Sequence, residues 1–246
     1  MSLLNHPYST SPLHFPSGQT LLIDADDTLW ENNLYFEKAI ASFIEHLNHR
    51  HYSHEQVREF LNQVEQESIR QHGYGLHSFR RSLLRCFESL STEPLTAERE
   101  QEIIRFTHVV EDHAIELLAG VARTLPLLAA RHRLILMTKG NFLEQTGKLT
   151  RSKIGEHFSA IEIPAEKTPA AYCKVVDQHQ LDARSSWMIG NSPKSDINPA
   201  LEAGLHAVFL PHPHTWVLEH EAVRDAPEGQ HCLQLHGFAE LADIFA

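Results

Sequence analysis

One short apolar run followed at once by acidic residues limits the possible folds of this chain more than any other feature. Residues 21–23 (LLI) favour a β-strand without a polar face, and the side chains that follow are Asp24, Asp26, Asp27 and Thr28. Such a run predicts a buried strand of a parallel sheet, and open α/β folds bind their ligands at the carboxyl ends of these strands. Because neighbouring buried acids are costly unless a cation lies between them, the segment favours a metal-assisted active site.

Two other interpretations of the same segment compete with an active site. Asp residues often follow strands simply because they hydrogen-bond to nearby backbone and tolerate turn geometry. A calcium-binding loop would need glycine at its sixth position, counted from Asp24, but that position is Leu29. The calcium loop is therefore set aside, and the rest of the chain must decide between a turn and a site.

The overall composition limits the partners of the chain. Its 246 residues are enough for one large α/β domain or for a core with an inserted small domain. An apolar content of 42% and a charged content of 22% are ordinary for a soluble globular protein. The formal net charge of -11 argues against nucleic acid or an anionic membrane as partner, because both need a basic face. No stretch approaches the ~20 apolar residues of a membrane span.

The first residues and the cysteines point to a cytoplasmic protein. Residues 1–20 lack the basic start and the sustained apolar region of a signal peptide, and their Pro, Ser and His content predicts a loosely ordered arm. The cysteines are Cys86, Cys173 and Cys232, an odd and scattered set without a C-x-x-C pair. We therefore expect neither a disulfide framework nor a cysteine zinc site, and a reducing cytoplasm fits.

Histidine is unusually frequent, with 19 residues in the chain. His49, His51 and His54 form one cluster, and His212 and His214 form another. Such spacing can bind transition metals adventitiously. Neither cluster has an acid or a cysteine nearby in ligand register, so we interpret both as solvated surface and loop.

After the first motif the apolar residues recur with the period of an α-helix. This pattern covers four stretches, which are residues 34–47, 57–64, 76–90 and 103–117. The breaks between them fall at residues 49–54, 72–75 and 91–96. Four consecutive helices without a strand between them predict a small helical bundle.

From Gly120 onward, short apolar runs alternate with helical stretches. The runs are residues 134–137, 160–163, 187–189 and 207–210. This alternation is typical of a doubly wound parallel sheet, so the predicted fold class is α/β. The expected organisation is a core of residues 1–30 and 117–246, interrupted after its first strand by a helical domain of residues 31–116.

Each of the first four core strands is followed by polar residues with useful chemistry. Thr138 follows the second strand in MTKGN, and Lys167 follows the third in EKTP. The fourth strand ends in GNSPKSD, which contains Asn191 and Asp196. If the strands are parallel, these groups meet Asp24 at one edge of the sheet. Any one of them alone would be an ordinary cap, turn or surface residue, but four strand ends in this order favour an active site.

The segments DADDT, MT, EK and GNSPKSD resemble, in order, the four motifs of the haloacid dehalogenase superfamily. The resemblance covers almost the whole chain, and the predicted helical insert has the position of that superfamily's helical cap. Membership would imply a Rossmann-like parallel-sheet core, a required Mg²⁺ ion and an aspartyl-enzyme intermediate.

The resemblance implies a catalytic role for each of four residues. Asp24 is expected to attack phosphorus, and Asp26 to protonate the leaving oxygen and then to take a proton from the attacking water. Thr138 is expected to hydrogen-bond a phosphoryl oxygen. Lys167 is expected to neutralise charge between the nucleophile and the phosphate.

The expected Mg²⁺ site draws on the first and fourth motifs. Asp24 would give a carboxylate oxygen, Asp26 its backbone carbonyl and the fourth motif a side-chain oxygen. The fourth motif of the superfamily commonly has two acids, and here the first is Asn191, whose amide oxygen can bind Mg²⁺ but brings no charge. The site then depends more on Asp196, either as a direct ligand or as the residue that orients a metal-bound water, and the sequence leaves both roles open.

Two further residues are candidates for substrate binding. Lys139 directly follows Thr138, and Tyr74 lies in the His-Gly-Tyr-Gly break of the helical insert, where the glycines permit unusual backbone geometry. An ordinary helix–helix turn explains Tyr74 equally well. Trp30 either lines the entrance of the site or packs at the junction with the insert.

The sequence therefore predicts a Mg²⁺-dependent phosphatase that hydrolyses a small phosphorylated metabolite. A haloacid dehalogenase is the nearest alternative, but dehalogenases of this superfamily lack an acid two residues after the nucleophile, where this chain has Asp26. A phosphomutase and a catalytically silent phosphate-binding module also stay open as alternatives. The helical insert is expected to close over the core and to set substrate choice.

Overall fold

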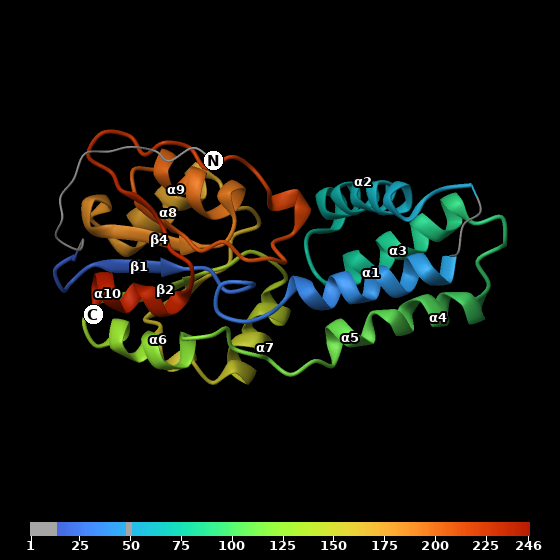
Figure 1. Cartoon of the computed structure of the whole chain (residues 1–246), viewed down its shortest axis with the longest axis horizontal. Helices are drawn as coiled ribbons and strands as arrows, with labels where there is room; N and C mark the ends of the chain where they lie inside the picture. The colour runs from blue at the N-terminus through green and yellow to red at the C-terminus, as the bar shows by residue number, and fades with distance from the viewer. Residues whose placement is uncertain (1–13, 48–50) are drawn as a thin grey trace.

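The computed structural model describes residues 14–47 and 51–246. Figure 1 shows two parts next to each other, a sheet with helices on both of its faces and a bundle of helices that the chain enters after strand β1. Most of the expected N-terminal arm and His49 lie outside the described residues. Within the described part of the chain, no helix is both long enough and apolar enough to cross a membrane.

In the described residues, six strands form one parallel sheet in the order β3-β2-β1-β4-β5-β6. The strands are β1 (Thr20–Ile23), β2 (Arg133–Met137), β3 (Ala160–Glu162), β4 (Ser186–Gly190), β5 (His206–Phe209) and β6 (Cys232–Gln234). The predicted fold class, an α/β Rossmann-like parallel-sheet core with an inserted helical-bundle cap, is confirmed. Strand β6 is absent from the sequence prediction, because three residues at the sheet edge do not stand out from a loop.

Strand β1 occupies the centre of the sheet, between β2 and β4. Its last residue, Ile23, is paired with Leu136 of β2 and with Ile189 of β4. The carboxyl ends of these three strands therefore lie side by side, and the loops that follow them share one edge of the sheet. The strand order reverses at β1, which is where open α/β sheets form ligand crevices.

Helices cover both faces of the sheet because its central strands are apolar on both sides. The core helices are α6 (Val121–Ala129), α7 (Phe142–Ser152), α8 (Pro169–His179), α9 (Asn198–Glu202) and α10 (Leu241–Phe245). Leu21 and Ile23 of β1 point into a cluster with α6, α7 and α10, whereas Leu22 points into a cluster with α8 and α9. Short helical turns are η1 (Gly155–His157), η2 (Ala183–Ser185), η3 (Pro193–Ile197), η4 (Val217–Glu219) and η5 (Phe238–Glu240).

The helical bundle has a hydrophobic core of its own. Its helices are α1 (Asn33–Leu47), α2 (His54–His72), α3 (Leu76–Leu90), α4 (Ala97–Phe106) and α5 (His108–Glu111). Phe43, Leu61 and Leu83 are fully buried in this core, which is separate from the clusters of the sheet. Helix α2 begins with a capping box, because Ser53 and Gln56 each accept a hydrogen bond from the backbone of the other.

The fourth helix of the sequence prediction is wrong over its last part. The sequence predicts a helix up to residue 117, whereas α4 ends at Phe106 and α5 at Glu111. The Thr107 hydroxyl donates to the Ile104 carbonyl at 2.7 Å and competes with the helical hydrogen bonds at this break. Leu117 keeps the helical period in the sequence, but it packs on the core of the sheet and not on the bundle.

The two chain segments that join the parts run antiparallel beside each other. Trp30 and Leu117 form an antiparallel bridge, the Glu31 amide donates to the Glu116 carbonyl at 3.0 Å, and the Leu118 amide donates to the Leu29 carbonyl at 2.9 Å. Trp30 is fully buried, so it packs at the junction and does not line an entrance. The exact division into residues 1–30 with 117–246 and residues 31–116 stays a prediction.

Candidate active site

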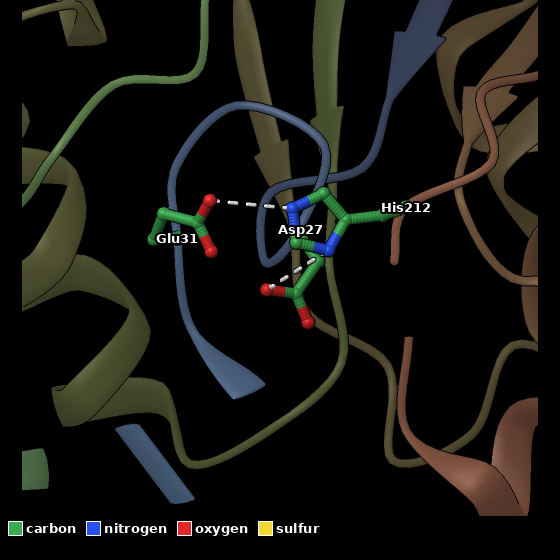
Figure 2. Close-up of side chains that lie close together, drawn as sticks. All are labelled: Asp27, Glu31 and His212. Atoms are coloured by element: carbon green, nitrogen blue, oxygen red, sulfur yellow. Dashed lines mark hydrogen bonds and ion pairs between the residues drawn. The ribbon is translucent and has the colours of Figure 1, made fainter. Parts of the chain in front are cut away.

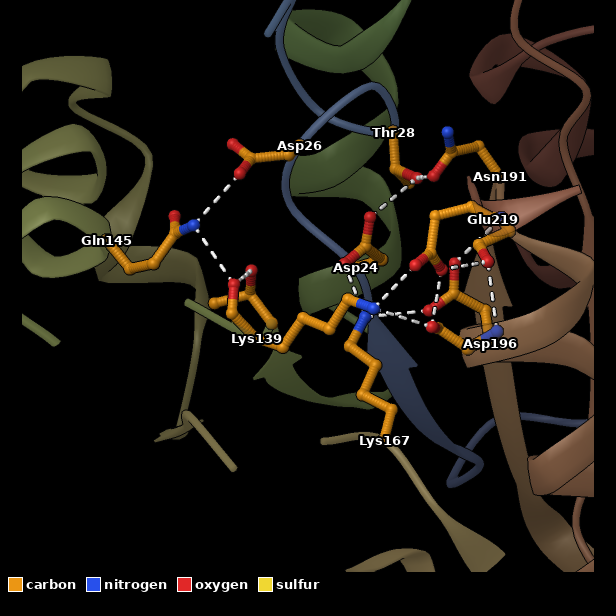
Figure 3. A network of polar contacts seen from close by, with 12 residues as sticks. Asp24, Asp26, Thr28, Lys139, Gln145, Lys167, Asn191, Asp196 and Glu219 are labelled. Carbon is orange, nitrogen blue, oxygen red and sulfur yellow. Dashed lines mark hydrogen bonds and ion pairs between the residues drawn. The ribbon is translucent and has the colours of Figure 1, made fainter. Parts of the chain in front are cut away.

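Asp24 lies at the centre of the site, directly after β1. Its side chain is buried, and Oδ1 accepts a hydrogen bond from the Lys167 ammonium group, while Oδ2 lies 3.2 Å from the Thr28 hydroxyl. Lys167 is itself buried and comes from the segment between β3 and α8. Figure 3 shows how these side chains, which are far apart in the sequence, converge at one edge of the sheet.

Lys167 and Asp196 extend this contact into a buried ion-pair network. The Lys167 ammonium group donates to Asp196 Oδ1 at 2.7 Å, and Asp196 Oδ2 accepts a hydrogen bond from the Ser192 amide at 2.9 Å. Asp196 can approach the end of β4 because Gly190 lacks a side chain, since a Cβ there would lie 2.2 Å from Asp196 Oδ2. Any other residue at position 190 would displace Asp196.

The network holds more negative charge than its lysine neutralises. Burial raises the pKa of Asp24 to about 7; Lys167 opposes this shift, and the charge of Asp196 adds to it. Burial alone would lower the pKa of Lys167, but Asp196 and Asp24 outweigh it and raise that pKa above its ordinary value. Two buried carboxylates on one ammonium group fit a divalent cation that prefers oxygen ligands.

Asn191 adds a neutral oxygen beside Asp24. Its Oδ1 lies 3.3 Å from the Thr28 hydroxyl, which also contacts Asp24 Oδ2. Its amide nitrogen donates to the Thr215 hydroxyl at 2.9 Å, which sets the orientation in which the oxygen faces Asp24. Asp196, by contrast, uses both of its oxygens in the contacts described above. The Thr28 hydroxyl has one hydrogen and can donate it to only one of Asp24 Oδ2 and Asn191 Oδ1, so one of these two oxygens is available to bind a cation.

Asp26 points away from Asp24, toward helix α7 (Figure 3). Lys148 Nζ donates to both Asp26 oxygens at 2.9 Å. Gln145 Nε2 donates to Oδ2 at 2.9 Å, and Trp30 Nε1 donates to Oδ1 at 2.7 Å. Burial alone would raise the pKa of Asp26, but Lys148 and the other donors hold it below its ordinary value. In this arrangement Asp26 is an ionised carboxylate that can accept a proton.

Helix α7 supplies these partners of Asp26, which the sequence does not single out. Asn141 caps the helix by accepting hydrogen bonds from two backbone amides of its first turn. Gln145 and Lys148 are three residues apart, so they lie on one face of the helix and both reach Asp26. A polar face is visible in the sequence, but its direction depends on how α7 packs on the sheet.

Lys139 is held by protein groups on three sides. Its ammonium group donates to Glu219 Oε1 at 2.7 Å, to Ser195 Oγ at 2.9 Å and to the Tyr74 hydroxyl at 3.2 Å. Burial alone would lower the pKa of Lys139, but Glu219 and Tyr74 raise it well above its ordinary value. Thr138, the preceding residue, is buried at the end of β2.

Glu219 belongs to this site although no motif in the sequence marks it. It is buried in η4 and accepts hydrogen bonds from Lys139, from the Ser192 hydroxyl at 2.6 Å and from the Ser195 hydroxyl. Burial alone would raise its pKa, but Lys139 outweighs it and keeps Glu219 ionised. Glu219 therefore connects Lys139 to the loop that follows β4.

Tyr74 reaches the core from the turn between α2 and α3. Its hydroxyl donates to Glu166 at 2.9 Å, and the Lys139 ammonium group lies 4.8 Å from the centre of its ring. In the same turn, the amide of Leu76 donates to Glu144 of α7 at 3.0 Å. These contacts hold the glycine-rich turn of the bundle against the core.

A cavity of about 170 Å³ lies between the core and the bundle. Every residue that the sequence singles out for catalysis, metal binding or substrate binding lines it: Asp24, Asp26, Tyr74, Thr138, Lys139, Lys167, Asn191 and Asp196. The structure therefore brings these side chains to one place. Their individual roles stay predictions.

The interpretation of His212 as a solvated surface residue is wrong. Its Nδ1 lies 3.8 Å from Asp27 Oδ1 and its Nε2 lies 3.4 Å from Glu31 Oε1, and its side chain is only 10% exposed (Figure 2). The acids come from a distant segment, so local spacing could not reveal them. Potential ligand atoms of these three residues lie within 4.8 Å of one another. The two ring nitrogens face different acids, and one metal ion can bind only one of these nitrogens.

Asp27 stabilises the start of helix α1. Its carboxylate accepts hydrogen bonds from the amides of Asn32 and Asn33 at 2.9 and 3.0 Å, where α1 begins. Burial, together with the charge of Asp26, raises the pKa of Asp27 to about 7. Asp27 thus anchors the first helix of the bundle to the loop that carries the catalytic candidates.

Known proteins resemble this chain both in sequence and in fold. A family model described as haloacid dehalogenase-like hydrolase matches residues 21–210. No curated protein matches the sequence. A haloacid dehalogenase-like family hydrolase from Xanthomonas campestris has 26% identity and a TM-score of 0.77, with 93% of this chain and 94% of that chain covered.

Two more distant structures share the fold. A 2-haloacid dehalogenase from Pseudomonas syringae pv. Tomato has 20% identity and a TM-score of 0.59, with 91% of this chain and 96% of that chain covered. A predicted phosphoglycolate phosphatase from Haemophilus somnus has 18% identity and a TM-score of 0.60, with the same coverage of 91% and 96%. The four motifs, their convergence at one sheet edge and the match over most of the sequence agree: the chain belongs to the haloacid dehalogenase-like hydrolases.

Proposed function

We propose that this hydrolase is a Mg²⁺-dependent phosphatase that cleaves a small phosphate monoester through a phospho-aspartate on Asp24. The observation that carries the proposal is the placement of Asp24 in the cavity between core and bundle, with Lys167 on one of its oxygens and Asp26 two residues further on. A carboxylate and an ammonium group in contact can bring a nucleophile to an anionic substrate without repulsion.

The oxygens of Asp24, of the Asp26 backbone and of Asn191 are the groups that would hold Mg²⁺, while Asp196 fixes Lys167. The ion would supply charge neutralisation for the phosphoryl oxygens. Asn191 brings no charge of its own, so most of the attraction comes from the buried carboxylates Asp24 and Asp196. The negative charge that Lys167 leaves uncompensated in their network supports the binding of a cation at this place.

In the first step, an Asp24 oxygen forms a bond to phosphorus, and the bond from phosphorus to the ester oxygen breaks. Asp26 gives a proton to the departing alkoxide. In the second step, water attacks phosphorus, Asp26 takes its proton, and inorganic phosphate and free Asp24 are released. The present contact with Lys148 keeps Asp26 ionised and suits the second step. The first step needs a protonated Asp26, so Asp26 must separate from Lys148 when the substrate enters.

Asp26 also favours a phosphatase over a dehalogenase. A halide leaves without a proton, whereas an alkoxide needs one, so an acid beside the leaving group is expected only in the phosphatase. The similar structures include a dehalogenase and a predicted phosphatase, so the fold alone does not choose between the two reactions. The acid at position 26 is the feature of this chain that supports a phosphatase.

A single panel of substrates tests the proposal. Sugar, nucleotide and small organic phosphates are incubated with the enzyme and Mg²⁺, and phosphate release is measured with and without EDTA. Short 2-haloacids are tested in parallel for halide release. We expect phosphate release that stops in EDTA and no halide release. Halide release without phosphate release would replace the phosphatase by a dehalogenase, and no release of either would favour a silent binding module.

A further inference from the structure

The bundle side of the cavity contains a buried acid that the proposed reaction does not use. Glu65 of α2 is 6% exposed and lines the cavity, and its Oε2 has no hydrogen-bond partner in the part of the chain that the structure describes. A buried carboxylate is normally hydrogen-bonded or paired closely, because its desolvation is costly. An unsatisfied carboxylate at a cavity wall is therefore a candidate for ligand binding.

The nearest cation, Arg58, is shared between Glu65 and a second acid. Arg58 Nη1 lies 3.7 Å from Glu65 Oε2, which is too long for a hydrogen bond, whereas its Nη2 lies 2.6 Å from Glu37 Oε1. One guanidinium group thus serves two carboxylates, and it hydrogen-bonds Glu37 but not Glu65. Burial raises the pKa of Glu65 to about 7, Arg58 opposes this shift, and a second cation in the cavity would favour the ionised form further.

Two serine hydroxyls on the bundle side of the cavity can accept hydrogen bonds but have no hydrogen left to give. The Ser78 hydroxyl donates to the Gly73 carbonyl at 2.6 Å, and the Ser82 hydroxyl donates to the Ser78 carbonyl at 2.9 Å. Both serines line the cavity, so they offer it only oxygen lone pairs. Such a wall matches a ligand group that carries several hydrogens and a positive charge.

The bundle side of the cavity also carries apolar side chains, which come from Phe36, Ile40, Ile69 and Phe79. A chain of methylene groups fits this surface, and two phenylalanine rings near a carboxylate also suit an ammonium group. A sugar would leave most of its hydroxyl groups without partners here.

We propose that Glu65 determines specificity by binding the protonated amine of the substrate, so that the preferred substrates are phosphate monoesters of amino alcohols with an apolar chain between phosphate and amine. The inference rests on the proposed phosphatase function and deepens it. The phosphate binds at Asp24 and Lys167, and the amine reaches Glu65 on the bundle side of the same cavity.

The first experiment measures kcat/KM for a length series from aminopropyl to aminooctyl phosphate near neutral pH, where the amine is protonated. Each ester is compared with the alkyl phosphate in which a methyl group replaces the ammonium group, and with the matching hydroxyalkyl phosphate. At the best length we expect the amine to be preferred by about tenfold or more. An equal or lower kcat/KM for the amine at every length would overturn the inference.

Glu65→Gln tests whether Glu65 is the cause. It keeps the size of the side chain and removes its charge, so the preference for the amine over the alkyl ester should fall at least severalfold. Glu59→Gln, an exposed position on the same helix, is the matched control and should keep the preference. A preference that survives Glu65→Gln would overturn the assignment of Glu65.

A binding measurement separates this inference from the phosphatase proposal. Calorimetry of wild-type enzyme with amino alcohols and with isosteric alkanols needs no turnover and no variant. Tighter binding of the amino alcohol supports the Glu65 site even if no phosphate ester is hydrolysed, in which case only the phosphatase proposal fails. Equal binding together with normal hydrolysis of simple esters would overturn the Glu65 inference alone.

Discussion

Asp24 is the residue on which the proposed reaction depends most directly. Asp24→Asn keeps the size of the side chain and an oxygen that can accept a hydrogen bond from Lys167, but an amide is a poor nucleophile. We expect kcat on a simple aryl phosphate to fall by about a thousandfold or more, with an unchanged circular dichroism spectrum. Asp177→Asn on the exposed side of α8 is the control. Wild-type turnover by Asp24→Asn would rule out the phospho-aspartate.

Asn191 permits a test that does not need turnover. Its Oδ1 and Asp24 Oδ2 lie on either side of the Thr28 hydroxyl, so Asn191→Asp would put another negative charge beside the buried acids. Without Mg²⁺ this repulsion should lower Tm, and with Mg²⁺ the added charge should strengthen binding about tenfold. The rise in Tm on adding Mg²⁺ should therefore be larger than in the wild type.

Asn191→Ala gives the opposite change at the same position. It removes the oxygen without adding charge, so the Mg²⁺-dependent rise in Tm should be smaller than in the wild type. If both variants respond to Mg²⁺ like the wild type, Asn191 does not face the cation, and Asp196 would be the ligand from the fourth motif.

At the scale of elements, helix α3 depends on a residue from the core for its first turn. Gly75 precedes the helix and has no side chain to cap it, and Glu144 of α7 accepts the Leu76 amide at 3.0 Å instead. Gly75 has φ of +127°, and a Cβ there would lie 2.8 Å from Glu144 Oε1, so glycine is needed for this contact. The bundle is thus capped by the core at the edge of the cavity.

Glu144→Ala should remove this cap. We expect a loss of about 1 kcal/mol in the free energy of unfolding, measured by urea denaturation, because a helix N-terminus loses a charged acceptor. Glu88→Ala is the control, because Glu88 is an exposed residue of α3, the helix that Glu144 caps. It should change stability much less. Equal losses in the two variants would mean that the Glu144 contact contributes nothing beyond an ordinary surface side chain.

The elements also show what the sequence can and cannot predict. Strand β1 and its acids are predicted because a buried apolar run and its polar end are local features. Lys148 and Glu219 are not, because each matters only through a partner brought close by tertiary packing. The same reason explains why the predicted helix wrongly extends to Leu117. The apolar period that includes Leu117 is a local feature of the sequence, whereas the pairing of Leu117 with Trp30 depends on tertiary structure.

At the scale of the whole molecule, polar contacts around the cavity connect the core and the bundle. Asn33 Nδ2 donates to the His214 carbonyl at 2.8 Å, and Lys148 donates to the Asn32 side chain at 2.7 Å. Each part keeps its own hydrophobic cluster. Because polar contacts exchange with water more easily than apolar packing, the two parts can change their relative position without exposing either core. Such movement would break the hydrogen bond between Lys148 and the Asn32 side chain.

Tyr74 is the side chain through which this arrangement can be tested. Tyr74→Phe keeps the ring beside Lys139 but removes the hydrogen bonds to Glu166 and Lys139. The bundle should then close less firmly over the core. Substrates that fill the cavity should lose more kcat/KM than a small aryl phosphate, by about threefold to tenfold, since only they need a closed cavity.

The matched control for this change is Tyr52→Phe. Tyr52 belongs to the bundle, is 46% exposed and is not part of the wall of this cavity, so its replacement should leave the ratio between large and small substrates unchanged. A loss in Tyr74→Phe that is the same for every ester would mean that Tyr74 acts on folding or on the chemical step. If the ratio of kcat/KM between large and small substrates shifts in Tyr74→Phe but not in Tyr52→Phe, the Tyr74 hydroxyl contributes to the closure on which substrate choice depends.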